Sequence, residues 1–180
     1  MAPDRDPRPL IGEPLALDLL NTEKLAAGEP VDLFTAPDGL AGWLDAVGID
    51  APDDDAVRRA LGEARAAIRG VVTSGRGARE RLNSVLARGR IAVSIDHRDA
   101  VTRSIEVSAP PWRPAVLAAM NLVDLLETAP ERIRRCSHPN CVLWFLDTTR
   151  NGTRRWCSMA GCGNRAKAKR HYERSLSTGG

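Results

Sequence analysis

The sequence lacks the features that identify several common classes of protein. No run approaches the roughly 20 consecutive apolar residues that a membrane-spanning helix needs, and no secretory signal is visible in it. Cysteine is absent from residues 1–135, and lysine occurs only three times in 180 residues. Aromatic residues make up 4% of the chain, so a core must be built mainly from aliphatic side chains. We therefore expect a cytoplasmic protein that makes no membrane contact.

The four cysteines that are present lie near the C-terminus in two pairs. Cys136-x4-Cys141 and Cys157-x4-Cys162 each have four intervening residues, and fifteen residues separate the pairs. Two close pairs on a loop of this length are typical of a tetrahedral zinc site with four thiolate ligands. Four protein ligands leave no position for water or substrate, so we expect one structural Zn²⁺ and no catalytic metal.

Three other uses of the cysteine region remain open at this point. Two disulfides need an oxidising compartment, for which the sequence gives no signal. A four-thiolate iron–sulfur cluster takes the same soft ligands. His138 could replace one cysteine as a ligand, although its neighbour Pro139 suits an ordinary loop equally well. Spacing and context favour zinc over all three.

Charge is distributed unevenly along the chain, whose formal net charge is +3. Residues 132–174 contain eleven Lys and Arg but only two acidic residues, Asp147 and Glu173, which gives a formal charge of +9. The rest of the chain has fifteen basic and twenty-one acidic residues, a formal −6. An acidic body joined to a basic metal module predicts a polyanionic partner, most often nucleic acid. A solvated basic face that only keeps the protein soluble is the alternative.

The length fits one domain of roughly 130 residues with a smaller one appended. Hydrophobic periodicity predicts a mainly helical body with one β-hairpin at about residues 90–108, which is an α+β fold. The predicted helices cover about residues 15–22, 35–47, 53–72, 82–89 and 116–129. The predicted parts are a flexible, proline-rich lead-in (1–14), the body (15–130), the metal module (131–175) and a tail (176–180).

The metal module is too short to bury a sufficient core, so metal binding must supply much of its folding free energy. The first cysteine pair should form a knuckle, followed by a strand over Val142–Leu146. The turn dipeptide Asn151-Gly152 should return the chain antiparallel along residues 153–156. A helix should start at Cys162, and this order of elements is treble-clef-like.

The few aromatic residues and the many basic ones of the module have separate predicted roles. We expect at least two of Trp144, Phe145 and Trp156 to form a small core beside the metal. Guanidinium groups contact phosphate oxygens well, and a major groove admits a helix. This chemistry supports phosphate contact better than base readout. The predicted nucleic-acid contacts are Arg154, Arg155, Arg165, Lys167, Lys169 and Arg170.

Several strings of residues match the pattern of one known family. They are Cys136-x4-Cys141, Trp144-Phe145-Leu146-Asp147, Arg150-Asn151, Arg154-Arg155-Trp156-Cys157-Ser158-Met159 and Cys162-Gly163-Asn164-Arg165. This run resembles the CGNR-type zinc finger. In that family the finger follows an ABATE domain, and Leu17-Asp18-Leu19-Leu20-Asn21-Thr22 is similar to the signature near the start of that domain. The resemblance covers nearly the whole chain and is weaker across the helical body.

The resemblance implies zinc on Cys136, Cys141, Cys157 and Cys162, and DNA binding by a stress-induced transcription regulator. It assigns no role to Asp18 and Asn21, which could form a ligand site, cap a helix or pack against another domain. Neither these two residues nor His97 and Asp99 make an acid–base or nucleophile pair that the sequence reveals. We therefore predict that the protein is not an enzyme.

Our leading hypothesis is a bacterial DNA-binding transcriptional regulator. Its zinc finger contacts DNA, and its body senses a small-molecule effector, binds a protein or forms a homodimer. The alternative is a protein–protein interaction module whose basic finger docks an acidic partner, which could be the acidic body of its own chain. RNA binding is a third hypothesis, with base stacking by Trp144 or Tyr172 as its distinguishing feature.

Overall fold

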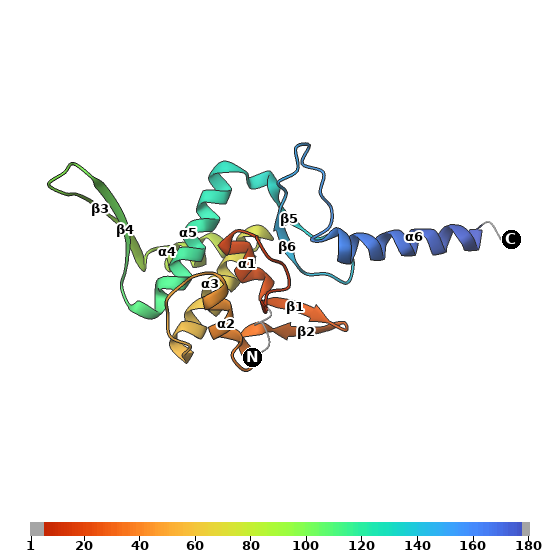
Figure 1. Cartoon of the computed structure of the whole chain (residues 1–180), viewed down its shortest axis with the longest axis horizontal. Coiled ribbons are helices and arrows are strands. Elements are labelled where there is room, and N and C mark those ends of the chain that lie inside the picture. Colours follow the sequence, from red (N-terminus) through yellow and green to blue (C-terminus); the bar gives the residue numbers. More distant parts are fainter. Residues whose placement is uncertain (1–5, 178–180) are drawn as a thin grey trace.

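The computed structural model describes residues 6–177, apart from the side chains of residues 170, 171, 173, 176 and 177 (Figure 1). Its helices are α1 (Leu15–Asn21), α2 (Gly39–Ala46), α3 (Asp55–Val72), α4 (Ala78–Leu86), α5 (Arg113–Thr128) and α6 (Asn164–Ser177). Its strands are β1 (Glu23–Ala26), β2 (Glu29–Asp32), β3 (Gly89–Ile95), β4 (Val101–Val107), β5 (Ile133–Arg135) and β6 (Trp144–Leu146). The strands pair as antiparallel hairpins, β1–β2, β3–β4 and β5–β6. The predicted α+β class is confirmed.

Helix α1 is almost completely buried and packs against both α3 and α5. Six of its seven residues, Ala16–Asn21, are buried. Helix α3 presents the apolar stripe that its periodicity predicts, because Val57, Leu61 and Ile68 are fully buried in the core. The Asp54 carboxylate accepts a hydrogen bond from the Val57 N–H at 2.8 Å and so caps the start of α3.

Helix α2 begins later than the sequence predicts. The pattern favours Thr35 as its N-cap, whereas Thr35 ends a 3₁₀ turn over Leu33–Thr35. Asp32 starts that turn by accepting a hydrogen bond from the Phe34 N–H at 3.0 Å. The turn then approaches Gly39 so closely that a β-carbon there would lie 1.9 Å from one of its carbonyl oxygens. Only glycine fits this contact, and the helix starts there.

The described body contains two hairpins, where the sequence predicts one. Hairpin β3–β4 matches the prediction, but β1–β2 was missed. The strands of β1–β2 are four residues long and mostly polar, so hydrophobic alternation gave no signal. Its turn uses Ala27 and Gly28 with φ of 52° and 93°, as tight hairpin turns require. Arg65 secures the hairpin to α3 by ion pairs with Asp32 and, at 3.1 Å, with Glu23.

Residues 6–14, the described portion of the expected flexible lead-in, contact both parts of the molecule. Arg8 forms an ion pair with Asp18 of α1 at 3.2 Å. Leu10 packs against the cysteine cluster, and the Glu13 carboxylate accepts a hydrogen bond from the Leu146 N–H at 2.7 Å. This segment therefore bridges the body and the metal module. The first five positions of the expected lead-in lie outside the described residues.

The described residues form two hydrophobic cores, one in the body and a smaller one around the cysteines. Trp144 belongs to the body core although its strand lies in the metal module. Phe145, the next residue, is fully buried in the cysteine cluster, where Trp156 also packs. Two of the three aromatic residues thus lie beside the metal site, as the sequence predicts. Within the described residues, no helix has both the length and the apolar character to cross a membrane.

Candidate metal centre and basic surface

The first cysteine pair lies at the turn of the β5–β6 hairpin. Strand β5 ends directly before Cys136, and Cys141 lies just before β6. The Cys136 N–H donates to the Leu143 carbonyl at 2.9 Å, and the Cys141 N–H donates to the His138 carbonyl at 3.0 Å. These bonds close the knuckle that the sequence predicts.

The predicted return strand over residues 153–156 is wrong. Strand β6 pairs with β5 instead, with Trp144 opposite Arg135. The Arg154 N–H donates to the Asp147 carboxylate at 2.9 Å, so the backbone there bonds to a side chain instead of a neighbouring strand. The sequence pattern could not distinguish β5 from residues 153–156 as the partner of β6.

The second cysteine pair lies at the start of α6. The Ser158 hydroxyl accepts a hydrogen bond from the Gly161 N–H at 3.2 Å and begins a wide helical turn over Met159–Gly163. This turn contains Cys162 and leads directly into α6. A knuckle followed by a ligand pair at the first turn of a helix is the treble-clef-like arrangement that the sequence predicts.

The four thiol groups converge on one point. All four Sγ atoms lie within 4.8 Å of one another, and all four residues are buried. Cys157 Sγ lies 3.8 Å from Cys141 Sγ and 3.6 Å from Cys162 Sγ. A tetrahedral zinc ion with Zn–S bonds of about 2.3 Å requires S–S separations of about 3.8 Å. Disulfide sulfurs would lie about 2.05 Å apart, so the geometry fits one Zn²⁺ and no disulfide.

His138 is not part of the described ligand cluster. Its Nδ1 accepts a hydrogen bond from the Asn140 N–H at 3.2 Å, which stabilises the knuckle turn. The alternative in which this histidine replaces a cysteine is therefore not supported by the geometry. Four cysteines supply the complete tetrahedral set.

Without a cation, ionisation of Cys141 opposes ionisation of its neighbours Cys157 and Cys162. A hydrogen bond from Cys157 lowers the pKa of Cys141 to about 5. The same hydrogen bond, together with burial, raises the pKa of Cys157, and burial raises the pKa of Cys162 to about 11. A dication at the centre supplies the charge that allows all four to bind as thiolates.

Hydrogen bonds from neighbouring groups to sulfur support this charge. The Cys157 N–H donates to Cys136 Sγ at 3.4 Å, and the Arg165 guanidinium donates to Cys162 Sγ at 2.9 Å. Arg165, predicted as a nucleic-acid contact, is therefore also a partner of a metal ligand. Such groups hold ligands in place and reduce the negative charge of a four-thiolate site.

Arg154, another predicted nucleic-acid contact, is directed inward. Its guanidinium donates to the carbonyls of Trp156 and Cys157. It also forms an ion pair with Glu13 at 3.5 Å and lies 4.3 Å from the centroid of the Phe145 ring. These contacts occupy most of the guanidinium, so few of its N–H groups remain to bind a phosphate. Arg154 therefore fixes the chain at the second ligand pair, a role that its charge alone did not reveal.

Asp147 is a structural residue of the finger that was not among the predicted site residues. Its side chain is buried and accepts hydrogen bonds from the Thr149 N–H at 3.0 Å and the Thr149 hydroxyl at 2.6 Å. Burial acts to raise its pKa, but these bonds and the Arg154 N–H outweigh burial and hold the pKa below its usual value. An Asp followed two residues later by Thr is a turn signal that could have identified it.

Asp18 and Asn21, the candidates in the body, both have packing partners. The Asp18 carboxylate accepts a hydrogen bond from Trp43 Nε1 at 2.8 Å and pairs with Arg8. Burial raises the pKa of Asp18 despite these two partners. Asn21 bonds to the backbone of Trp144. Both residues are at most 2% exposed, so of the open interpretations the structure favours packing.

The remaining predicted contacts with nucleic acid are Arg155, Lys167, Lys169 and Arg170. The first three are exposed, whereas the side chain of Arg170 lies outside the described residues. The Arg155 guanidinium lies 5.2 Å from the centroid of the Trp156 ring. Beside it is a hollow of about 530 Å³, which Thr149, Thr153 and Met159 also line.

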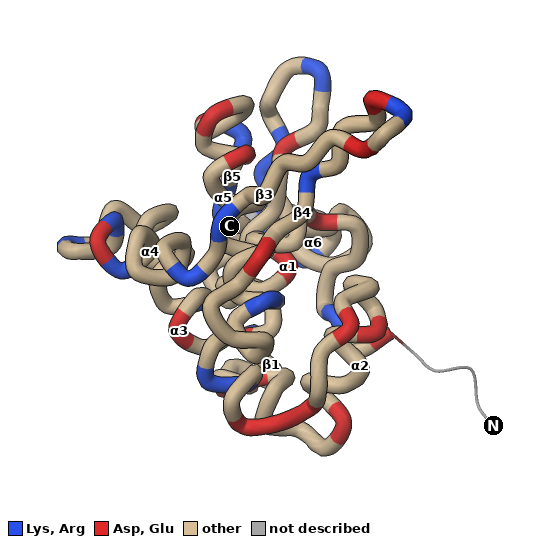
Figure 2. Tube along the Cα trace, turned by 90° about the vertical axis from the view of Figure 1, so that its left-hand side faces the viewer, with Lys and Arg blue, Asp and Glu red and all other residues tan. Residues whose placement is uncertain are grey.

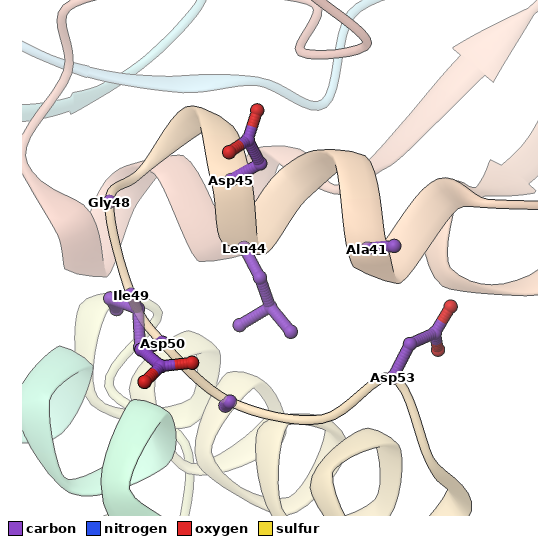
Figure 3. A pocket seen from close by; sticks show the side chains of 8 residues that line it. Ala41, Leu44, Asp45, Gly48, Ile49, Asp50 and Asp53 are labelled. Atoms are coloured by element: carbon purple, nitrogen blue, oxygen red, sulfur yellow. The ribbon is translucent and has the colours of Figure 1, made fainter.

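A second hollow, of about 430 Å³, lies in the body between α2 and the loop that leads to α3 (Figure 3). Leu44 points into it, and Asp50 and Asp53 lie on the loop. Asp53 forms an ion pair with Arg58 at 2.9 Å. Neither Asp18 nor Asn21 lines this hollow.

The fold and the thiolate cluster define a two-part protein with a structural zinc site. Comparison with known families divides the chain in the same way. Residues 132–175 match the CGNR zinc finger, and residues 13–129 match the ABATE family, described as "Putative stress-induced transcription regulator". The second match covers more than half of the chain, so the protein belongs to the ABATE family. No curated protein matches the chain.

Proposed function

We propose that this protein is a cytoplasmic DNA-binding transcriptional regulator of a stress response, and that its zinc finger contacts DNA phosphates. The description of the ABATE family supports a regulatory role. The observation that carries the DNA proposal is the basic helix α6, which extends away from the body (Figure 1). A helix in this position can approach a groove of DNA without a collision between the body and the duplex.

The distribution of charge supports the same interface. Arg155, Lys167 and Lys169 are exposed on the finger. Acidic segments gather around α2, in the body (Figure 2). A polyanion is attracted to the finger and repelled by the region around α2, which orients the protein on DNA.

Two earlier alternatives find less support in the described residues. Helix α6 extends away from the acidic body, so docking of this helix on its own chain is not favoured (Figure 1). Trp144 is 7% exposed and packs in the body core, so it cannot stack on an RNA base, whereas Tyr172 is 64% exposed. We assign no catalytic role to the body, because its buried Asp18 is held by Trp43 and Arg8.

The proposal is tested by incubating the zinc-loaded full chain with fragmented genomic DNA at about 150 mM salt and sequencing the retained fragments, since specific and non-specific binding separate there. Enrichment of a shared sequence is expected. Four to six phosphate contacts would lower the affinity by roughly a hundredfold to a thousandfold between 50 and 200 mM salt.

A pair of double variants locates the surface. Arg155→Ala with Lys167→Ala should weaken binding and reduce the salt dependence by about two counterions. Arg59→Ala with Arg79→Ala removes the same charge from exposed positions of the body and should change binding little. Equal losses in both pairs would reject the finger as the contact surface. Failure of the zinc-loaded chain to retain DNA even at low salt would favour a protein-docking module.

A further inference from the structure

The hollow beside Arg155 lies on the zinc finger. Its lining residues come from the loop after β6 and from the start of the helical turn over Met159–Gly163. Of the described residues that line it, none is a cysteine, so the hollow is separate from the metal centre. Its volume of about 530 Å³ falls within the roughly 300–1,000 Å³ of typical small-molecule sites. It is therefore large enough to hold one small organic molecule.

Two apolar side chains, Trp156 and Met159, form part of the wall of this hollow. Both lie against Gly163, where a β-carbon would lie 2.7 Å from Met159 Sδ and 3.4 Å from Trp156 Cδ1. Glycine at this position thus allows both side chains to pack beside the helical turn. Trp156 is partly buried, whereas Met159 is 54% exposed. An indole and a thioether side by side offer an apolar, polarisable surface for a planar ring.

The polar groups that line the hollow are hydrogen-bond donors. The Arg155 guanidinium is exposed and lies 5.2 Å from the centroid of the Trp156 ring, so a ligand on this ring also reaches the cation. The Ser158 hydroxyl accepts a hydrogen bond from the Gly161 N–H and still has its own proton to donate. The Thr153 hydroxyl lines the same hollow. Of the described lining residues none is acidic, so the polar groups favour an anion.

The carboxylates nearest to the hollow along the chain and through Arg154 have cationic partners of their own. Asp147 is 2% exposed and pairs with Arg134 at 3.7 Å. Glu13 pairs with Arg154 at 3.5 Å. The charge of Arg155 therefore remains available to a ligand in the hollow.

The other hollows do not share this chemistry. Asp45, Asp50 and Asp53 line the hollow of the body, which therefore does not favour an anion (Figure 3). A hollow of about 260 Å³ on the finger is lined by Cys157 and Cys162 and belongs to the metal centre.

We propose that the hollow beside Arg155 binds one nucleotide, with its base on Trp156 and Met159 and its phosphate on Arg155. Bases of every kind stack on aromatic side chains, and a guanidinium forms paired hydrogen bonds with phosphate oxygens. The ligand is a free mononucleotide or an unpaired nucleotide of a DNA strand, since both carry these groups. The site adds a base contact to the phosphate contacts of the proposed function, and a free nucleotide can occupy it without them.

NMR spectra of the zinc-loaded full chain test the site with deoxyadenosine monophosphate. One base and one ion pair should give about millimolar affinity, so the titration extends to about 10 mM. The indole N–H signal of Trp156 and the methyl signal of Met159 should shift, whereas the indole signal of Trp43, which is fully buried in the body, should not. Deoxyribose phosphate lacks the base and should produce much smaller shifts. Unmoved signals of Trp156 and Met159, or equal shifts with both compounds, would overturn the proposal.

Two matched variants test the cation. Arg155→Ala should weaken binding of the mononucleotide about tenfold, because a charged hydrogen-bond donor is lost. Arg135→Ala removes the same charge from an exposed position of the finger that does not line the hollow, and it should change the affinity by less than about twofold. Metal analysis checks that both variants keep one zinc ion. Equal losses would mean that only the overall charge of the finger attracts the nucleotide, and the site would be rejected.

Longer nucleic acids identify the source of the nucleotide. A short single-stranded deoxyadenosine oligomer that binds more tightly than the mononucleotide, with the same shifts, assigns the site to a DNA strand. Equal affinity assigns it to the free nucleotide. Retention of duplex DNA by a protein whose Trp156 and Met159 signals do not respond to either compound would overturn this site alone. Binding of the nucleotide without retention of DNA would reject only the proposed function.

Discussion

Asn21 of α1 and Trp144 of β6 exchange two hydrogen bonds across the junction between the body and the zinc finger. Asn21 Nδ2 donates to the Trp144 carbonyl at 2.9 Å, and the Trp144 N–H donates to Asn21 Oδ1 at 2.8 Å. Asn21 is 1% exposed and Trp144 is 7% exposed. The side-chain amide of Asn21 thus bonds to the backbone N–H and carbonyl of Trp144, which lie on the edge of β6 that does not pair with β5. The finger is therefore packed against the body at this point, and is not merely tethered to it.

Replacement of Asn21 by Ala should destabilise the protein by about 2–4 kcal/mol, because it leaves a buried N–H and a buried carbonyl without partners. Asn83→Ala, at an exposed position of α4, should cost less than about 0.5 kcal/mol. Urea unfolding of the zinc-loaded proteins, followed by circular dichroism, measures both. Similar stabilities of the two variants would show that the junction contributes little.

Replacement of Arg154 by Ala should weaken zinc retention, whereas replacement of its neighbour Arg155 should not. Arg154 bonds to the carbonyls of Trp156 and Cys157 beside a metal ligand, and Arg155 is exposed. Loss of a group that positions metal ligands typically lowers affinity by about 10- to 100-fold. Competition with a chromogenic chelator measures this. If both variants keep zinc equally well, Arg154 does not position the ligands.

Replacement of Cys157 by Ser should remove the zinc ion and unfold the finger, because the metal replaces a larger core in this segment. Metal analysis should find one zinc per unaltered chain and none in the variant. Body resonances in an amide NMR spectrum should remain dispersed, since the described body core includes few residues of the finger. Ser137→Ala, next to Cys136 but exposed, should keep the metal. A dispersed, metal-free finger spectrum for Cys157→Ser would contradict the assignment.

Asp18 should make stability fall as pH rises. Burial raises its pKa in the folded protein, although Trp43 and Arg8 act in the opposite direction. The folded state then holds the proton at pH values where the unfolded state has released it, so stability is lost above the ordinary pKa of 3.8 until the folded pKa is passed.

Asp18→Asn cannot titrate and isolates this effect. The stability of the unaltered protein minus that of the variant should decrease with pH through this window and then become constant. Denaturant unfolding of both proteins at matched pH values between about 4 and 8 measures this difference in stability. Both proteins bind zinc, so the pH dependence of zinc binding cancels in the subtraction. A difference that grows with pH would mean that Arg8 and Trp43 outweigh burial.

Several features could be predicted from the sequence because they depend on neighbours along the chain. The spacing within each cysteine pair fits a knuckle and a helical turn, whatever the rest of the fold. The stripe of Val57, Leu61 and Ile68 follows from helical periodicity. The alternation in β3 and β4 follows from the geometry of strands. Hairpin β1–β2 could not be predicted from the sequence, because its strands are short and polar. Ion pairs with Arg65 hold it in place, and only the packing of α3 brings Arg65 beside these strands.

The sequence by itself determined the metal and its four ligands, since thiolate chemistry and ligand spacing are local properties. Only the tertiary structure decided which charged and polar residues face inward. Asn21 and Trp144 are 123 positions apart, and Arg154 and Arg155 are adjacent but differ in role. Buried hydrogen-bonding groups need partners wherever the fold brings them, and no local pattern specifies which distant group will supply them.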